Sequence, residues 1–255
     1  MTVAARVDLD TAAYALRLGD DALVHAQRLC LWTARAPQLE EDVALLNLAL
    51  DLLGQARSLL TLGGEREGRG RDEDDLAFLR DPDEFTNALL VEVDDPDFGW
   101  TVARQLLVAA YALPLWQALC TSADEGLAGV AGKAVKEAAY HLDHARTWVV
   151  RLGDGTEESH RRVQAGLDGL WPYAAELFAR DPLVDRLLAR GVAADPAALQ
   201  RVWRATVEEV LSEATLAVPS AAPVSGGRSG RHTDGFAGLL HEMQALHRAH
   251  PGASG

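Results

Sequence analysis

The chain has 255 residues with 38 acidic and 24 basic side chains, so its formal net charge is −14. A field of this sign repels a phosphate backbone and an anionic membrane surface, which argues against nucleic acid or a membrane as a partner. Apolar residues make up 48% of the chain and charged residues 24%, a balance typical of a globular protein rather than a disordered one.

The cysteine content and the N-terminal sequence indicate the compartment. The two cysteines, Cys30 and Cys120, are too few for a disulfide framework in a chain of this length. Residues 1–10 hold no apolar run of signal-peptide length, and the most apolar window, Leu106–Cys120, is too short to span a membrane. We therefore expect a cytoplasmic protein in which residues 1–10 are disordered.

The apolar residues recur with the helical period of 3.6 residues, and no segment alternates with a period of two. The sequence therefore predicts an all-α protein. In chain order the expected helices are Thr11–Ala34, Gln38–Leu62, Phe98–Thr121, Gly126–Leu152, Glu157–Arg180, Pro196–Ala217 and Asp234–His250.

Three segments between these helices have the composition of loops or crossovers. Residues 63–73 predict a solvated loop, residues 74–95 predict one or two short helices that cross the bundle, and residues 219–233 predict a flexible loop. Two helices followed by a long crossover and further helices are typical of ferritin-like proteins. We expect a single domain over residues 1–255, a ferritin-like four-helix bundle with additional C-terminal helices.

The helix predicted over Gln38–Leu62 is apolar on nearly every side, which is typical of a fully buried helix. Its polar residues Asn47, Asp51 and Gln55 are spaced four apart and form one narrow stripe. A buried carboxylate costs several kcal/mol unless it is paired, hydrogen-bonded, protonated or bound to a metal. Asp51 is therefore the first place to test for a metal centre.

A di-iron centre in a four-helix bundle takes a Glu from each of two helices and a Glu-x-x-His pair from each of the other two. After Asp51, the histidine position holds Gly54. After Glu137, it holds Tyr140, and His141 comes one residue late. Two of the four helices therefore lack a proper ligand pair.

The other two long helices lack the required carboxylates. The first has none between Ala22 and Trp32, and the third carries Arg104 and Gln105 and no acid between Trp100 and Cys120. A cation stands where a dication would bind. The ligand count therefore predicts no metal-binding residue in this chain. The sequence also has no Walker-type loop, dinucleotide fingerprint or nucleophile elbow, so we expect no catalytic or cofactor-binding residue.

The degenerate positions are expected to form a polar network instead. Its predicted members are Asp51, Arg104, Gln105, Glu137, Tyr140 and His141. We expect Asp51 and Glu137 to pair with cations, and Arg104, Arg28 and Arg17 are the candidates. Loss of a fully buried Asp51 would then cost about 3–5 kcal/mol.

The alternative is an iron-dependent oxygenase with a rearranged metal site. Glu137, His141 and His144 share one helix face at spacings of four and three, which a metal could use together with Asp51. Iron storage of the ferritin type ranks last, because it needs a ferroxidase centre.

Several strings resemble one family. They are YALRLGD at Tyr14–Asp20, LDLLGQAR at Leu50–Arg57 and KAVKEAAYH at Lys133–His141. These strings resemble the non-catalytic C subunits of bacterial phenylacetyl-CoA ring epoxidases, and the resemblance extends from about Tyr14 to about Arg248.

The resemblance implies a ferritin-like subunit that holds no metal and pairs with a related catalytic subunit, which holds the di-iron site. A small bridging subunit and a flavin and iron–sulfur reductase would complete the complex, which epoxidises the ring of phenylacetyl-CoA in aerobic phenylacetate degradation. A role for Arg228 and Arg231 in steering the CoA phosphates is a further hypothesis.

Overall fold

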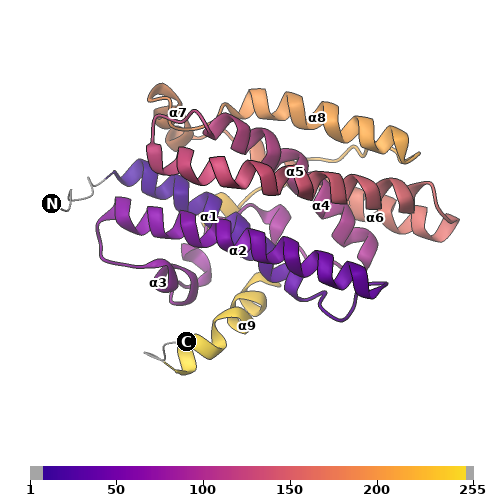
Figure 1. Ribbon diagram of the computed structural model, residues 1–255, viewed down its shortest axis with the longest axis horizontal. Coiled ribbons are helices and arrows are strands. Elements are labelled where there is room, and N and C mark those ends of the chain that lie inside the picture. The colour runs from indigo at the N-terminus through magenta and orange to yellow at the C-terminus, as the bar shows by residue number, and fades with distance from the viewer. Residues whose placement is uncertain (1–7, 251–255) are drawn as a thin grey trace.

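Four long helices form an antiparallel bundle in the computed structural model, which describes residues 8–250 (Figure 1). They are α1 (Leu9–Cys30), α2 (Leu39–Glu67), α4 (Phe98–Leu119) and α5 (Glu125–Gly153). Helix α1 packs on α2, α4 packs on α5, and α2 meets α5. Residues 8–250 contain no strand, so the all-α prediction is confirmed.

The remaining helices cover the bundle. Helices α6 (Glu157–Ala174) and α8 (Pro196–Glu213) pack on α4, α7 (Pro182–Ala189) packs on α1, and α9 (Phe236–Ala249) packs on α3 (Glu73–Phe78). Short 3₁₀ turns lie at Pro82–Glu84, Leu89–Val91, Ala175–Phe178 and Gly227–Ser229. Helix α3 and the first two of these turns form the crossover from α2 to α4, as the sequence predicts.

The buried apolar side chains form two clusters. The larger surrounds α4 and includes side chains of α5, α6 and α8. The smaller lies between α1 and α2 and extends to α3 and α9. Helix α4 packs against three other helices, which is why its sequence is apolar on almost every side.

Several helix boundaries differ from the sequence prediction; the first helix, for example, ends at Cys30 rather than Ala34, and α8 ends at Glu213 rather than Ala217. Helix α1 begins at Leu9, because Asp8 caps it by accepting a hydrogen bond from the Thr11 backbone N–H at 3.1 Å. Disorder was therefore wrong for residues 8–10, and the rest of that prediction falls on residues 1–7, outside the described part. Helix α2 continues to Glu67, and the helix expected to reach Arg180 ends at Ala174 and is followed by α7.

Helix α2 is not buried on every side, contrary to the sequence prediction. Its outward residues Leu39, Val43, Leu46, Leu50 and Leu53 are exposed. Among the described helices, α2 is also the one that is long and apolar enough by composition to cross a membrane, although 44% of that apolar stretch is buried in the bundle.

Candidate functional site

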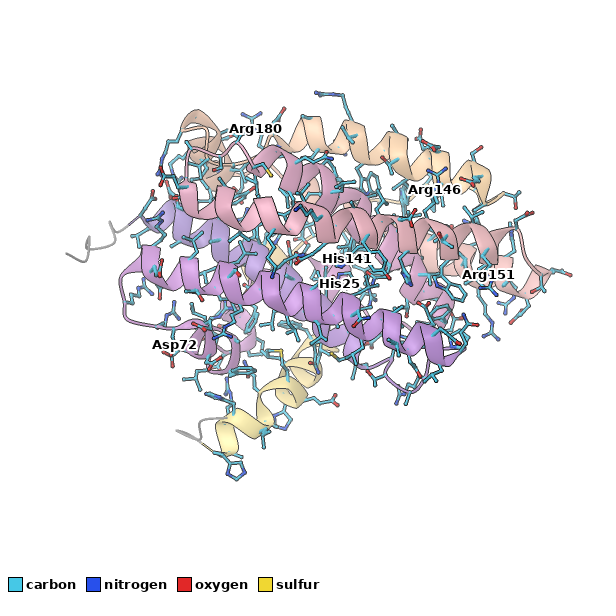
Figure 2. All side chains as sticks on the ribbon, viewed as in Figure 1. His25, Asp72, His141, Arg146, Arg151 and Arg180 are labelled. Atoms are coloured by element: carbon cyan, nitrogen blue, oxygen red, sulfur yellow. The ribbon has the colours of Figure 1, made fainter. Side chains whose placement is uncertain are left out.

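The centre of the bundle is where a ferritin-like protein would hold metal ligands, and here it contains a cluster of polar side chains. Helix α1 contributes His25, α2 contributes Asp51 and Gln55, and α5 contributes Glu137 and His141. Figure 2 shows His25 and His141 near the middle of the bundle. The contacts of these residues decide whether the cluster can bind a metal.

Side chains of α2 and α5 form two pairs. The His141 Nε2 lies 3.1 Å from an Asp51 carboxylate oxygen. The Gln55 amide donates a hydrogen bond of 2.9 Å to Glu137, and Lys133 lies 3.6 Å from the other oxygen of that carboxylate. Burial lowers the pKa of His141 despite its bond to Asp51, so the imidazole is neutral at neutral pH and donates its Nε2–H. Both carboxylates are thus satisfied within the protein.

Glu137 pairs with a cation, Lys133, as predicted, but neither Asp51 nor Glu137 pairs with any of the three candidate arginines. Arg104 pairs with Asp95 at 3.3 Å, Arg28 pairs with Asp94 at 2.7 Å, and Arg17 pairs with Asp181 at 2.7 Å. Asp94 and Asp95 belong to the last part of the crossover, just before α4, and supply the partners of Arg28 and Arg104. In the sequence these acids are notable only as helix-breaking neighbours of Pro96.

Asp95 is the buried partner of Arg104. Its carboxylate also accepts hydrogen bonds from Trp32 Nε1 at 2.9 Å and from the Thr101 hydroxyl at 2.8 Å. Burial alone would raise the pKa of Asp95, but the Arg104 charge and these hydrogen bonds outweigh it and hold the pKa below its usual value. Arg104 and Asp95 therefore form a buried ion pair that is fully charged at neutral pH.

The predicted network divides into separate parts. Asp51, Glu137 and His141 lie together on α2 and α5. Arg104 and Gln105 lie on α4. Tyr140 is 51% exposed and lies outside the network, contrary to the prediction, because it points away from the bundle on α5.

His25 is buried on α1, in a stretch from Ala22 to Trp32 that offers no carboxylate. It borders a cavity of about 40 Å³ whose other walls are largely apolar, including Leu52, Val108 and Trp116. Neither ring nitrogen has a hydrogen-bond partner within residues 8–250. Burial, followed by the nearby charge of Arg104, lowers the pKa of His25 to about 3, so the imidazole is neutral.

These side chains do not fit a di-iron centre. The α1 position holds a neutral histidine, the α4 position holds a guanidinium, and the α5 tyrosine is exposed. Within residues 8–250, no group of three or more His, Cys, Asp or Glu side chains is placed to hold a metal ion. The donor set lacks both the number of ligands and the negative charge that two irons need.

The rearranged set of Asp51, Glu137, His141 and His144 is not brought together either. His144 turns to Glu41, at 2.9 Å, and the same carboxylate accepts a hydrogen bond of 2.6 Å from Trp148 Nε1. The sequence analysis missed Glu41. The spacing could have revealed it: Glu41 precedes Leu45 by four residues and Leu48 by seven, which places its side chain on the same buried face of α2.

Other buried carboxylates, also missed, hold the crossover and the late loop in place. Glu176 accepts backbone hydrogen bonds from Leu89 and Gly226, each of 2.8 Å. Arg228 is bound to Asp21 at 2.7 Å and is only 11% exposed in its side chain. Arg228 is therefore not free to bind a phosphate, which contradicts its part in the hypothesis that Arg228 and Arg231 steer the CoA phosphates. Arg231 is exposed, and its part stays a prediction.

The His232 side chain fixes the end of the same loop. Its Nδ1 lies 2.6 Å from the buried Glu92, which also accepts a 2.6 Å hydrogen bond from the Thr233 backbone. Burial alone would lower the pKa of His232, but the bond to Glu92 outweighs it and raises the pKa above its usual value.

Comparison with known proteins relates the chain to one family. A profile described as phenylacetic acid catabolic protein matches residues 2–254. The chain is 46% identical over 241 residues to the C subunit of the 1,2-phenylacetyl-CoA epoxidase of Escherichia coli (strain K12), covering 94% of this chain and 97% of that protein.

A solved structure with a similar fold is a protein with aldehyde deformylating oxidase activity from Synechococcus. It matches with a TM-score of 0.58 at 17% identity and covers 83% of this chain and 95% of that chain. At this identity the likeness concerns the fold, and it confirms the ferritin-like architecture.

Proposed function

Because the chain belongs to the family of phenylacetic acid catabolic proteins, we propose that it is the non-catalytic subunit of a multicomponent di-iron monooxygenase. The complex epoxidises the aromatic ring of phenylacetyl-CoA in aerobic phenylacetate degradation. This chain pairs with the catalytic subunit and supports it, and the di-iron centre, a small bridging subunit and a reductase lie outside the chain. The complex works in the cytoplasm.

The observation that carries this proposal is the donor set at the bundle centre. Asp51 and Glu137 each have a partner from within the protein, and Arg104 occupies the interior where a dication would need carboxylates. A subunit retained in an oxygenase without an oxygen-activating centre has a supporting role, which the homology to the C subunit of an epoxidase favours.

The supporting role is tested by removing the remaining donors. The triple variant Asp51→Asn, Glu137→Gln, His141→Gln keeps the size of each side chain but removes three of the four groups that an iron site on α2 and α5 would use. Assembled with the catalytic subunit, it is expected to turn over phenylacetyl-CoA within about twofold of the wild-type rate. The reaction is measured as product formed by a reductase-coupled assay.

The control is the double variant Glu208→Gln, Arg204→Gln, which likewise replaces charged side chains by amides but does so at an exposed pair on α8. If the triple variant assembles as well as this control but loses turnover, the chain contributes catalytic groups and the rearranged-site alternative is right.

A further inference from the structure

The outer side of α2 carries an apolar stripe that nothing in the described structure covers. Its members, called the α2 stripe below, are Leu39, Val43, Leu46, Leu50 and Leu53. Their exposed fractions run from 38% at Leu53 to 74% at Leu39. Single exposed leucines are ordinary on a protein surface, whereas a contiguous row of five marks an interaction site.

The spacing of the stripe is that of a helix–helix seam. The residues follow one another at intervals of four, three, four and three, the a and d spacing of a heptad repeat. At 100° per residue they lie within about 80° of arc, and they extend over about 21 Å of helix. A partner helix running along α2 would therefore contact all of them at once.

A groove between α2 and α5 lies next to the stripe. Its volume is about 380 Å³, and its walls include Gly54 and Ser58 of α2 and Gly126 and Gly129 of α5. Small side chains on both walls keep the groove open and let another backbone approach closely.

Two of the glycines on the outer face of α5 have no packing role within the chain. A Cβ added to Gly129 or Gly132 would meet no atom within 4 Å. Glycine inside a helix costs about 1 kcal/mol relative to alanine. The two glycines thus lower the stability of α5 at positions where a larger side chain would fit. Their lack of a side chain lets another protein approach the backbone of α5 closely.

The α5 side of this face carries both positive and negative side chains. Lys133 and Lys136 are the chain's two lysines, and both are exposed on α5; Lys133 lines the groove together with Glu125 and Glu137. Lys133 is 73% exposed in its side chain and lies 3.6 Å from Glu137, while within the described residues Lys136 makes no salt bridge. The two groove carboxylates balance Lys133, so Lys136 is the exposed cation on this face that is left to pair with a carboxylate of a partner segment.

We propose that the α2 stripe and the α2–α5 groove form the docking surface for a helix of the catalytic subunit. That helix presents an apolar seam to the stripe and a carboxylate to Lys136. The proposal rests on the proposed function, because it assumes the catalytic subunit as the partner, and it adds the face that is used. A second copy of this chain fits less well, since two molecules of charge −14 repel each other.

The stripe is tested with the double variant Leu46→Gln, Leu50→Gln. Both side chains are exposed, so the isolated protein is expected to keep its melting temperature. Affinity for the catalytic subunit, measured by isothermal titration calorimetry, is expected to fall at least tenfold, a loss of about 1.4 kcal/mol or more. The matched control is Leu246→Gln, whose side chain is 75% exposed and belongs to α9, the helix that packs on α3 (Figure 1).

The groove is tested with Gly129→Leu. This change fills the groove and improves the helix propensity of α5, so binding falls while the isolated chain becomes no less stable. Gly238→Leu on α9 is the matched control, because a Cβ there also meets no atom within 4 Å. It is expected to leave binding unchanged.

The reactivity of the two lysines tests the docking surface in the wild-type protein, without a substitution. Acetylation by an N-hydroxysuccinimide ester, followed by peptide mass spectrometry, reports Lys133 and Lys136 separately. Both are expected to react at least tenfold more slowly in the complex than in the isolated chain. An unrelated protein at the same concentration serves as the control and is expected to leave both rates unchanged.

The outcomes separate this proposal from the proposed function. If the wild-type chain does not bind the catalytic subunit, the proposed function itself fails. If the wild type binds and the variants bind equally well with both lysines still reactive, the docking surface is wrong and the proposed function stands. An isolated chain that sediments as a dimer and becomes a monomer with Leu46→Gln, Leu50→Gln would assign the face to a second copy and overturn the proposal.

Discussion

The buried charges of this protein are paired across elements that are distant in sequence. The side chains of Arg104 and Asp95 are 1% and 5% exposed, whereas that of Asp51 is 36% exposed and bonds to a neutral imidazole. The free-energy cost of losing a carboxylate therefore differs strongly between Asp95 and Asp51, although only Asp51 stands out in the sequence.

Replacement of Asp95 by alanine leaves the Arg104 guanidinium buried without its ion-pair partner, and we expect a loss of about 3–5 kcal/mol of unfolding free energy. Asp51→Ala removes a hydrogen bond to a partly exposed carboxylate and is expected to cost about 1 kcal/mol. Urea denaturation at neutral pH measures the unfolding free energy of each variant. Equal losses for the two variants would contradict this account of the buried charges.

The buried imidazole of His25 makes the protein sensitive to acid. Its pKa in the folded state is about 3, below the ordinary value of 6.5, so the unfolded chain binds this proton first as the pH falls. The folded state therefore loses stability below about pH 6.5, by up to about 1.4 kcal/mol per pH unit from this residue, until the pH approaches 3.

His25→Leu removes that titration and two buried nitrogens that have no hydrogen-bond partner within residues 8–250. We expect nearly wild-type stability at pH 7.5 and a shallower loss of stability between pH 6.5 and pH 4.5, measured by chemical denaturation at several pH values. If the unfolding free energy of the variant falls with pH as steeply as that of the wild type, His25 is not the cause of the acid sensitivity.

At the residue scale, the sequence predicted which positions lack ligands but not the contacts that replace them. The absence of carboxylates from two helices can be read directly from the chain. The partners of Arg104 and Arg28 cannot, because Asp95 and Asp94 reach them through a crossover whose path depends on tertiary packing. Glu41 and His144 meet for a similar reason, across the contact between α2 and α5.

At the scale of elements, the sequence located the long helices because their apolar faces have a strong helical period. The end of α2 was misplaced because glycine was interpreted as a helix stop. A Cβ at Gly63 would lie 2.7 Å from Leu16, and one at Gly64 would lie 2.3 Å from the Arg71 carbonyl oxygen. These glycines are inside the helix because neighbouring segments approach closely there, which no local pattern reveals.

The crossover and the late loop are held together by buried carboxylates rather than by regular structure. Glu176, which is 3% exposed, receives backbone N–H groups from the crossover at Leu89 and from the loop at Gly226 and Arg228. One side chain thus joins segments that the sequence analysis treated as independent, including a loop it expected to be flexible.

Glu176→Gln replaces one accepting oxygen with an amide group that faces the same donors. We expect a loss of about 2–3 kcal/mol of unfolding free energy. Faster backbone hydrogen exchange is expected at residues 226–229, measured by mass spectrometry. Glu209→Gln, a change at an exposed glutamate, is the control. Unchanged exchange at residues 226–229 in Glu176→Gln would contradict the role of Glu176.

At the scale of the whole molecule, the bundle keeps the ferritin-like arrangement, and within residues 8–250 no group of three or more His, Cys, Asp or Glu side chains is placed to hold a metal ion. Neutral histidines and satisfied carboxylates occupy the centre, the Arg104–Asp95 ion pair is buried, and a row of exposed apolar side chains runs along the outside of α2. This distribution suits a subunit whose work is done through contact with another protein.

The measurement that tests this account most directly is iron content, determined by plasma mass spectrometry on the chain purified alone and on the chain copurified with the catalytic subunit. We predict iron near zero in the isolated chain after aerobic reconstitution with ferrous iron, and iron together with epoxidation of phenylacetyl-CoA in the complex. About two irons per isolated chain would contradict the account and make this protein an oxygenase in its own right.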